Sequence, residues 1–353
     1  MNFQQFDLAD YGWSPFFSSQ LSAEELADML PVRVMAVHRG GLDVAGPSYE
    51  GLISPFAEDA ANDEAVATVG DWLLIEPETR RPRRLLDRKS LFKRRAPGTD
   101  RRVQLIAANV DTLLIVSSCN QDFNEARLER YLALARDADV MPVIVLSKAD
   151  LAEDAGDFAQ RAGRLLPGLL VETINALDPD EVSCLEPWCG KGQTVALVGS
   201  SGVGKTTLVN TLMGTDSLAT QGIRQDDAKG RHTTTGRALH HLPSGGWLMD
   251  TPGMRELQLT DARDGVDEVF ADVVEIAAKC RFSDCQHGSE PGCAVQAAIV
   301  DGSLDSDRLR RWKKLAAEDA YNSSSLAERR AKGRAFGKMV RGIMKEKDRG
   351  KWG

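Results

Sequence analysis

The segment from Gly199 to Thr206 combines three glycines, a lysine and a threonine at a spacing suited to phosphate. An apolar run, Thr194 to Val198, precedes it and a helix-forming stretch, Leu208 to Met213, follows. The glycines let backbone N–H groups converge on phosphate oxygens, and the helix N-terminus adds a positive dipole end. Lys205 is then expected to reach the β- and γ-phosphates and Thr206 to bind Mg²⁺. The pattern predicts a nucleoside triphosphate site, and its strand and helix disfavour an accidental match.

A second group of reactive side chains lies near the C-terminal end, where three thiols and one imidazole fall within fourteen residues: Cys280, Cys285, His287 and Cys293. Four soft or borderline ligands at this spacing can close a loop around a tetrahedral Zn²⁺. Because all four positions are taken by protein, no position remains for water, and the predicted site is structural. The alternative is three buried cysteines and a surface histidine.

The elements that would position the phosphate site alternate between strand and helix. Asp111 to Ser117 and Val143 to Leu146 read as buried strands, with a helical stripe from Asn124 to Asp137 between them. A further helix around Ala155 to Leu166 and a strand around Leu169 to Ile174 follow. This alternation predicts a doubly wound parallel sheet with its ligand at the carboxyl ends of the strands.

The first hundred residues have a different pattern. Met1 to Pro31 reads as an appended arm with a short helix opened by Ser22, three residues before Glu25. From Val32 to about Arg95, short strands alternate with Gly-containing turns, including two strands expected between Val66 and Ile75. We expect a small closed β-barrel of the OB type, a fold whose faces commonly bind RNA.

A base-recognition element stands at the end of the strand that leads to Ser147-Lys148-Ala149-Asp150. It resembles the Asn/Thr-Lys-x-Asp element of guanine nucleotide-binding proteins, whose Asp accepts from guanine. In most such proteins the phosphate loop comes first. Here the order is Ser147 to Asp150, Asn175 to Leu177, the phosphate loop, Thr233 to Thr235 and Asp250 to Gly253. This order resembles the circularly permuted GTPases.

The block Gly230 to Thr235, together with the Cys-rich segment, resembles the ribosome small-subunit-dependent GTPase family (RsgA, YjeQ or YloQ) from about Val32 to Ile299. The resemblance implies a multidomain α/β chain: an arm at 1–31, an OB-type β-barrel at 32–100, a circularly permuted P-loop GTPase domain at 101–260, and a helical zinc-binding domain at 261–353 with a basic C-terminal helix.

The motifs and the resemblance together predict the nucleotide-binding residues. They are Ser147, Lys148, Asp150, Asn175, Ala176, Gly199, Ser200, Ser201, Gly202, Val203, Gly204, Lys205, Thr206, Thr207, Asp250 and Gly253. Guanine preference rests on Asp150 and on the alkyl stem of Lys148. Ser147 stands where the family usually has Asn, and we expect its shorter side chain not to span the distance to the phosphate loop. Asn175 likewise replaces the usual Ser.

The resemblance also implies roles in hydrolysis. Asp250 fits the Walker-B position that holds Mg²⁺ through a water, and the Gly253 N–H meets the γ-phosphate. Met254 stands where many GTPases have a Gln, and a thioether cannot orient water. We therefore expect slow intrinsic hydrolysis. The catalytic candidates are Lys205, one of Thr233 to Thr235 as a switch ligand of Mg²⁺, with Thr234 favoured, and His232, for which a solvated loop histidine is the alternative.

Charge is unevenly distributed over the 353 residues, whose net charge is −8. Arg80 to Arg102 holds eleven Lys and Arg against two Asp, and Arg308 to Gly353 holds fifteen against five acidic residues. A helical stripe at Leu309 to Ala316 precedes a basic amphipathic helix from Ser325 to Lys345, which can bind RNA, a membrane surface or its own domain. We favour ribosomal RNA as the partner.

No basic leader or apolar run of about 18 residues is present, so we expect a cytosolic protein without a membrane partner. No apolar stripe is left without a domain to cover it, which favours a monomer.

The resulting hypothesis is a GTPase, using GTP, Mg²⁺ and one structural Zn²⁺, that binds the 30S subunit and its 16S rRNA. Hydrolysis would be activated by the subunit and would drive release late in subunit maturation. The alternatives are a P-loop NTPase with a metabolic or regulatory role and an RNA-binding scaffold that does not turn nucleotide over.

Overall fold

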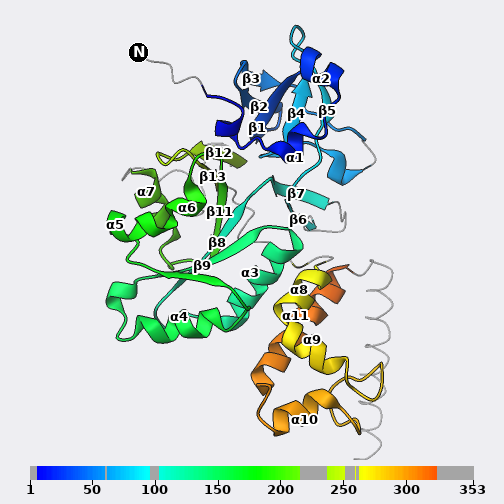
Figure 1. The fold of residues 1–353 in the computed structure, drawn as a ribbon, viewed down its shortest axis with the longest axis vertical. Helices are drawn as coiled ribbons and strands as arrows, with labels where there is room; N and C mark the ends of the chain where they lie inside the picture. Colours follow the sequence, from blue (N-terminus) through cyan, green and yellow to red (C-terminus); the bar gives the residue numbers. More distant parts are fainter. Residues whose placement is uncertain are drawn as a thin grey trace, which may run out of the picture.

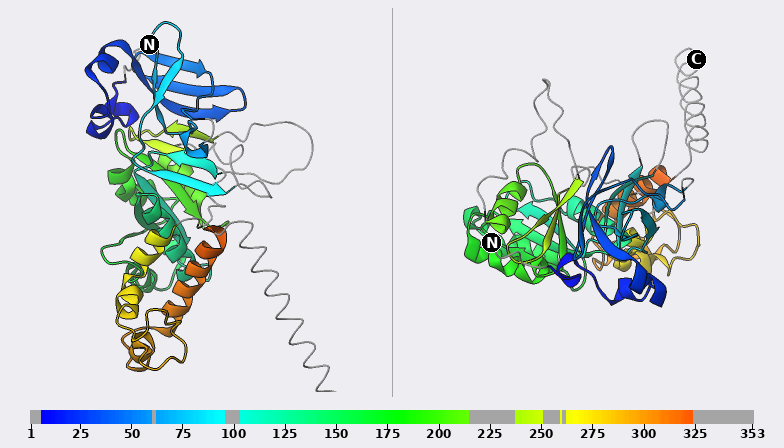
Figure 2. Two further views of the ribbon diagram at one scale, coloured as in Figure 1. Left: turned by 90° about the vertical axis from the view of Figure 1, so that its right-hand side faces the viewer. Right: turned by 90° about the horizontal axis from the view of Figure 1, so that it is seen from above.

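The computed structural model describes residues 6–59, 62–95, 103–214, 237–250, 259 and 262–323. Along the longest axis, an N-terminal group of antiparallel strands lies at one end, an α/β sheet in the middle, and the helices α8 to α11 at the other end (Figures 1 and 2). None of the helices in these ranges is long and apolar enough to cross a membrane.

The central sheet has the strand order β10-β9-β8-β11-β13-β12. The first five run parallel and β12 is antiparallel to β13. Their bounds are β8 Thr112–Ser118, β9 Met141–Ser147, β10 Leu170–Thr173, β11 Thr194–Gly199, β12 Arg237–His241 and β13 Trp247–Asp250. The parallel sheet predicted from the strand-helix alternation is confirmed.

The helices that follow β8 and β9 begin at side-chain caps. Asn124 Oδ1 accepts from Arg127 N at 3.0 Å at the start of α3 (Glu125–Asp137), and Asp154 Oδ1 accepts from Asp157 N at 3.1 Å in α4 (Ala155–Gly163). The others are α5 Pro179–Val182, α6 Glu186–Cys189, α7 Lys205–Met213, and the 3-10 turns η3 Ala149–Leu151 and η4 Ser183–Leu185.

The N-terminal strands form an antiparallel order β3-β2-β1-β4-β5. Their bounds are β1 Leu30–His38, β2 Gly41–Gly46, β3 Tyr49–Ile53, β4 Trp72–Ile75 and β5 Pro82–Leu85, with η2 at Asp63–Ala65. Among the described residues, no pairing of β3 with β5 closes this order, so the OB-type barrel stays a prediction. β1 also pairs with β12, which joins these strands to the central sheet.

One expectation for this region is wrong. Val66 makes only an isolated bridge with Ala57, so one strand, β4, stands where two were predicted. The segment after residue 102 is a strand, β7 (Val103–Ala108), paired with β6 (Leu91–Arg95) in a separate two-stranded sheet.

The N-terminal arm contains the predicted capped helix, α2 (Ala23–Asp28), with both bonds of the Ser22–Glu25 capping box. It is not an appendage, however. Besides the short η1 (Ala9–Tyr11) and α1 (Pro15–Ser18), it buries Phe17 and stacks Tyr11 on Trp247 with ring centroids 5.7 Å apart. These aromatic side chains supply the apolar area that fixes the arm on the sheet.

The C-terminal helices are α8 Arg263–Val269, α9 Ala271–Ala277, α10 Ala294–Val300 and α11 Ser306–Ser323. α8 and α9 do not form one continuous helix, because the chain is broken at Phe270, whose backbone leaves the helical region at φ −109° and ψ 33°. The Arg308 guanidinium carbon lies over the buried Phe270 ring, 4.4 Å from the ring centroid, where α8 meets α9. The predicted basic helix beyond Ser325 lies outside the described residues.

α8 packs directly on α3 of the central layer. A Cβ on Gly265 would lie 2.3 Å from Ala133 O, so only glycine allows this approach. An ion cluster extends the contact, because the fully buried Glu129 of α3 accepts from Arg308 at 2.9 Å and from Arg311 at 2.8 Å on α11. Paired charges of this kind satisfy one another, and removing one partner is strongly destabilising.

A buried arginine joins the arm, the N-terminal strands and the central sheet. Arg33 of β1 is 1% exposed, and its guanidinium donates to Tyr11 O at 2.6 Å, Thr194 Oγ1 at 2.7 Å, Asn109 O at 3.3 Å and Gly70 O at 3.4 Å. Burial lowers its pKa to about 10, with Asp111 and Asp71 opposing that shift, so it stays charged at neutral pH.

We expect Arg33→Met to lower the free energy of unfolding by about 3 kcal/mol, because it leaves buried oxygens without a donor. The shift is measured from urea unfolding monitored by tryptophan fluorescence. The matched control is Arg83→Met, because Arg83 is partly exposed and pairs with Glu76 at the surface. We expect this variant to change the free energy of unfolding by no more than about 0.5 kcal/mol. Equal effects of the two variants would contradict the role given to Arg33.

Candidate nucleotide and metal sites

The phosphate loop has the backbone that its glycines permit. Gly199, Gly202 and Gly204 adopt φ of 147°, 81° and 88°, and a Cβ on Gly199 would lie 2.2 Å from Val116 O. Lys205 is buried at the first turn of α7, and its Nζ donates to Gly199 O at 2.8 Å. The predicted strand, loop and helix are therefore present in sequence order.

The base-recognition loop is tied to the phosphate loop by two side chains. Ser147 Oγ lies 2.6 Å from Val203 O and 3.0 Å from Ser117 O, and Lys148 Nζ donates to Gly202 O at 2.8 Å. A hydroxyl carries one proton, and the shorter of its two contacts is the one to the phosphate loop. The expectation that Ser147 is too short to reach this loop is wrong, because β9 pairs with β8 and β8 pairs with β11, so the ends of these strands lie close together.

The third loop contacts the base-recognition loop and α7, the helix that follows the phosphate loop. Ala149 N donates to Ile174 O at 3.3 Å, and Ala176 O accepts from Thr211 Oγ1 of α7 at 2.7 Å. The backbone N–H of Asn175 donates to the Glu181 carboxylate at 2.7 Å, and its side-chain oxygen accepts from Leu177 N at 3.0 Å. The structure thus brings the segments 147–150, 175–177 and 199–207 together, with Asp150 exposed.

The predicted Mg²⁺ ligands lie on neighbouring elements. Asp250 ends β13, which pairs in parallel with β11, the strand that leads into the phosphate loop. Thr206 and Thr207 are half-buried in the first turn of α7, and Ser201 is exposed in the loop. His232, Thr234, Gly253 and Met254 lie outside the described residues, so their roles stay predictions.

One residue that contacts the loop was missed by the motif search. Arg127 Nη1, from the first turn of α3, donates to Ser200 Oγ. It lies 73 positions before Ser200 and belongs to no recognised motif, so only the fold reveals the contact.

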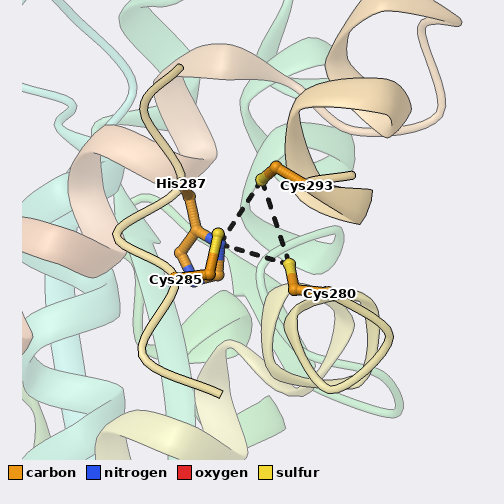
Figure 3. Close-up of side chains that lie close together, drawn as sticks. All are labelled: Cys280, Cys285, His287 and Cys293. Atoms are coloured by element: carbon orange, nitrogen blue, oxygen red, sulfur yellow. Dashed lines mark hydrogen bonds between the residues drawn. The ribbon is translucent and has the colours of Figure 1, made fainter. Parts of the chain in front are cut away.

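The four predicted metal ligands converge (Figure 3). Cys280 Sγ lies 3.5 Å from His287 Nδ1 and 3.9 Å from Cys293 Sγ, and Cys293 Sγ lies 3.7 Å from His287 Nδ1. All four ligand atoms, including Cys285 Sγ, lie within 4.8 Å of one another. Tetrahedral Zn²⁺ with bonds of about 2.3 Å to sulfur and 2.0 Å to nitrogen needs ligand separations of about 3.5–3.8 Å. The donor set and spacing fit such a metal.

The loop between these ligands is shaped by its own hydrogen bonds. Glu290 accepts from Gln286 N at 2.9 Å and Gly288 N at 2.6 Å, and His287 takes a left-handed φ of 54°. Cys293 caps α10, with Sγ accepting from Gln296 N at 3.4 Å. Burial lowers the pKa of His287, which favours the neutral imidazole that binds metal.

The first basic run is not a free cationic surface. Arg84 pairs with Glu25, Lys93 with Glu64, and Arg88 with the fully buried Asp71, each at 2.7 Å. Arg88 also donates to Glu64 O at 2.6 Å and Val66 O at 2.8 Å. Part of the charge that predicted an RNA contact therefore holds the N-terminal strands together.

The fold is similar to those of two solved structures. YjeQ from Thermotoga maritima aligns with a TM-score of 0.57 at 23% identity over 81% of this chain and 97% of that one. YloQ, described as a circularly permuted GTPase, also gives a TM-score of 0.57, at 24% identity over 84% of this chain and 97% of that one.

Sequence comparison narrows the class. The family model described as RsgA GTPase matches residues 85–260. "Small ribosomal subunit biogenesis GTPase RsgA 2" of Vibrio parahaemolyticus is 51% identical over 340 residues, which cover 96% of this chain and 93% of that protein. "Small ribosomal subunit biogenesis GTPase RsgA" of Mesorhizobium japonicum is 52% identical over 319 residues, covering 90% and 91%. The chain belongs to the RsgA GTPase family.

We expect Ser147→Ala to weaken binding of a fluorescent GDP analogue about fivefold, because the phosphate loop loses one buried hydrogen bond worth about 1 kcal/mol. The dissociation constant is measured by fluorescence titration. Ser183→Ala is the control, since that hydroxyl donates to Asp180 O within its own exposed turn and should leave affinity unchanged. An unchanged constant for Ser147→Ala would show that the contact to Val203 does not support binding.

Proposed function

We propose that this chain hydrolyses GTP to GDP and phosphate and acts in the biogenesis of the small ribosomal subunit. The observation that carries the proposal is the joining of a base-recognition loop, Ser147 to Asp150, to the phosphate loop in a permuted GTPase. The similarity to proteins named for small-subunit biogenesis, over nearly the whole chain, supports the cellular role.

In the proposed site, backbone N–H groups of Gly199 to Gly204 surround the phosphates and Lys205 neutralises their charge. Its Nζ already lies against the carbonyl of Gly199, on the inner side of the loop. Asp150 accepts from the guanine N–H groups, and the Lys148 stem covers the base. Thr206 and Asp250 are placed to hold Mg²⁺, which would neutralise charge on the β- and γ-phosphates.

Hydrolysis requires in-line attack of water on the γ-phosphorus and departure of GDP. Met254 cannot orient that water, so turnover by the isolated protein is slow in this proposal. His232 is the candidate side chain to position the water, and Thr234 the switch ligand of Mg²⁺. Contact with the subunit completes the arrangement and thereby activates turnover.

The connections of the fold provide a route from nucleotide state to partner contact. Asp250 ends β13, and the chain then continues to the helices α8 to α11, while β12 pairs with β1 of the N-terminal strands. A change at the γ-phosphate can thus act on both ends of the molecule. In the proposal, the GTP form binds the 30S subunit and its 16S rRNA, and the GDP form leaves.

The remaining assignments belong to the same proposal. The domain limits fall near residues 31, 100 and 260, the protein works as a monomer in the cytoplasm, and the Cys₃His cluster holds one structural Zn²⁺. The ligand separations and the absence of a ligand position for water in a four-residue set support this metal assignment.

We expect purified 30S subunits to raise GTP turnover at least about tenfold, as measured by phosphate release. Lys205→Ala should reduce the stimulated rate about a hundredfold, because a charge-neutralising donor is lost. An excess of ATP should not compete with GTP. A rate of GTP turnover that is unchanged by 30S subunits would refute the ribosomal role and favour a metabolic or regulatory NTPase. Equal competition by ATP would refute the assignment of Asp150 to guanine recognition.

For the metal, we expect one zinc per chain by mass spectrometry of the purified protein. Cys293→Ser should lose most of it and lower the melting temperature, because metal binding contributes to folding of this loop. Cys184→Ser, outside the cluster, is the control and should retain full zinc. Wild-type protein without zinc, or a Cys293→Ser variant that keeps all of it, would contradict the assignment.

A further inference from the structure

The two halves of the phosphate loop are held from different directions. Lys148 and Ser147 reach Gly202 and Val203 in the second half, from the loop after β9. In the first half, Ser200 Oγ accepts a hydrogen bond from the guanidinium of Arg127 on α3. Within the described residues, this bond to the Ser200 hydroxyl comes from outside both the phosphate loop and α7.

Arg127 stands on a well-fixed part of α3. Its backbone N–H donates to the cap residue Asn124 at 3.0 Å. The next two residues, Leu128 and Glu129, are buried, and Glu129 is clamped by Arg308 and Arg311. A side chain on such a rigid support can hold its partner with little loss of conformational freedom at the moment of ligand binding.

The contact also places a second positive charge beside the first half of the phosphate loop. Lys205 Nζ, which is expected to meet the phosphates, donates to Ser200 O, while Arg127 donates to Ser200 Oγ. A guanidinium has five N–H donors in a fixed fork, and a hydroxyl that accepts a hydrogen bond still has its own O–H to donate. Two cations therefore fix Ser200: Lys205 holds its backbone carbonyl and Arg127 holds its hydroxyl.

We propose that Arg127 is a positioning residue of the phosphate loop, acting through Ser200 to hold the first half of the loop in the conformation that accepts nucleotide phosphates. The inference rests on the proposed binding of GTP. Since it acts on the loop before the ligand arrives, it predicts a loss of affinity for both GTP and GDP, with little change in the chemical step.

The test is a double-mutant cycle on Arg127→Ala and Ser200→Ala, with dissociation constants for fluorescent GTP and GDP analogues. Each single variant should weaken binding about fivefold, the loss of one partly exposed charge-assisted hydrogen bond. The double variant should bind no more than about tenfold more weakly than wild type, because both changes remove the same interaction. Fully additive losses would overturn the route through Ser200.

Kinetics and controls separate positioning from helix stability. In 30S-stimulated turnover, Arg127→Ala should raise KM about fivefold and change kcat less than twofold. Arg127→Lys, which keeps one donor and the charge, should recover part of the affinity. Arg130→Ala, which removes a pair with Glu318 on the same helix, should leave affinity unchanged.

The outcomes distinguish this inference from the proposed function. If wild-type protein binds guanine nucleotides and Arg127→Ala binds them equally well, the inference fails and the proposed function stands. If Arg130→Ala loses as much affinity as Arg127→Ala, the effect belongs to α3 stability and the inference fails too. If wild-type protein binds no guanine nucleotide, both fail.

Discussion

The burial of one charge, on Arg33, is the constraint on which the arrangement of the molecule depends. A guanidinium removed from water must find acceptors for its donors, and here they come from the arm, the turn before β4, Asn109 and Thr194. Thr194 begins β11, the strand that ends in the phosphate loop. The N-terminal strands therefore cannot separate from the nucleotide-binding sheet without leaving a buried charge unsolvated.

A second set of buried charges has the same effect at the other end. Glu129 binds Arg308 and Arg311, and Gly265 allows α8 to approach α3 to backbone contact. α3 thus contacts α8 and α11 on one side and, through Arg127, the phosphate loop on the other (Figure 1). The N-terminal strands, the central sheet and the C-terminal helices are therefore joined by buried ion pairs and by strand pairing, although the sequence divides them into separate domains. This framework gives the proposed nucleotide-dependent change a physical route to both ends of the molecule.

Local patterns predicted much of the nucleotide-binding layer. The parallel strands, α3, α4 and α7 follow from apolar runs, caps and glycines, and the Cys₃His cluster from ligand spacing. Prediction failed where partners come from far along the chain. The arm reads as an appendage in the sequence, but Tyr11 stacks on Trp247. The helical segment after residue 262 is broken where Phe270 packs under Arg308, and part of the first basic run, including Arg88, lies in ion pairs.

By itself, the sequence determined the chemistry: which residues can surround a phosphate, which can hold a metal, and in what permuted order the motifs run. Tertiary structure alone decided which side chains support that chemistry. Ser147 reaches the phosphate loop, and Arg127 reaches Ser200, because parallel pairing places the ends of β8, β9 and β11 side by side. Spacing along the chain encodes local geometry, but contacts across strands depend on register and packing, which no single segment contains.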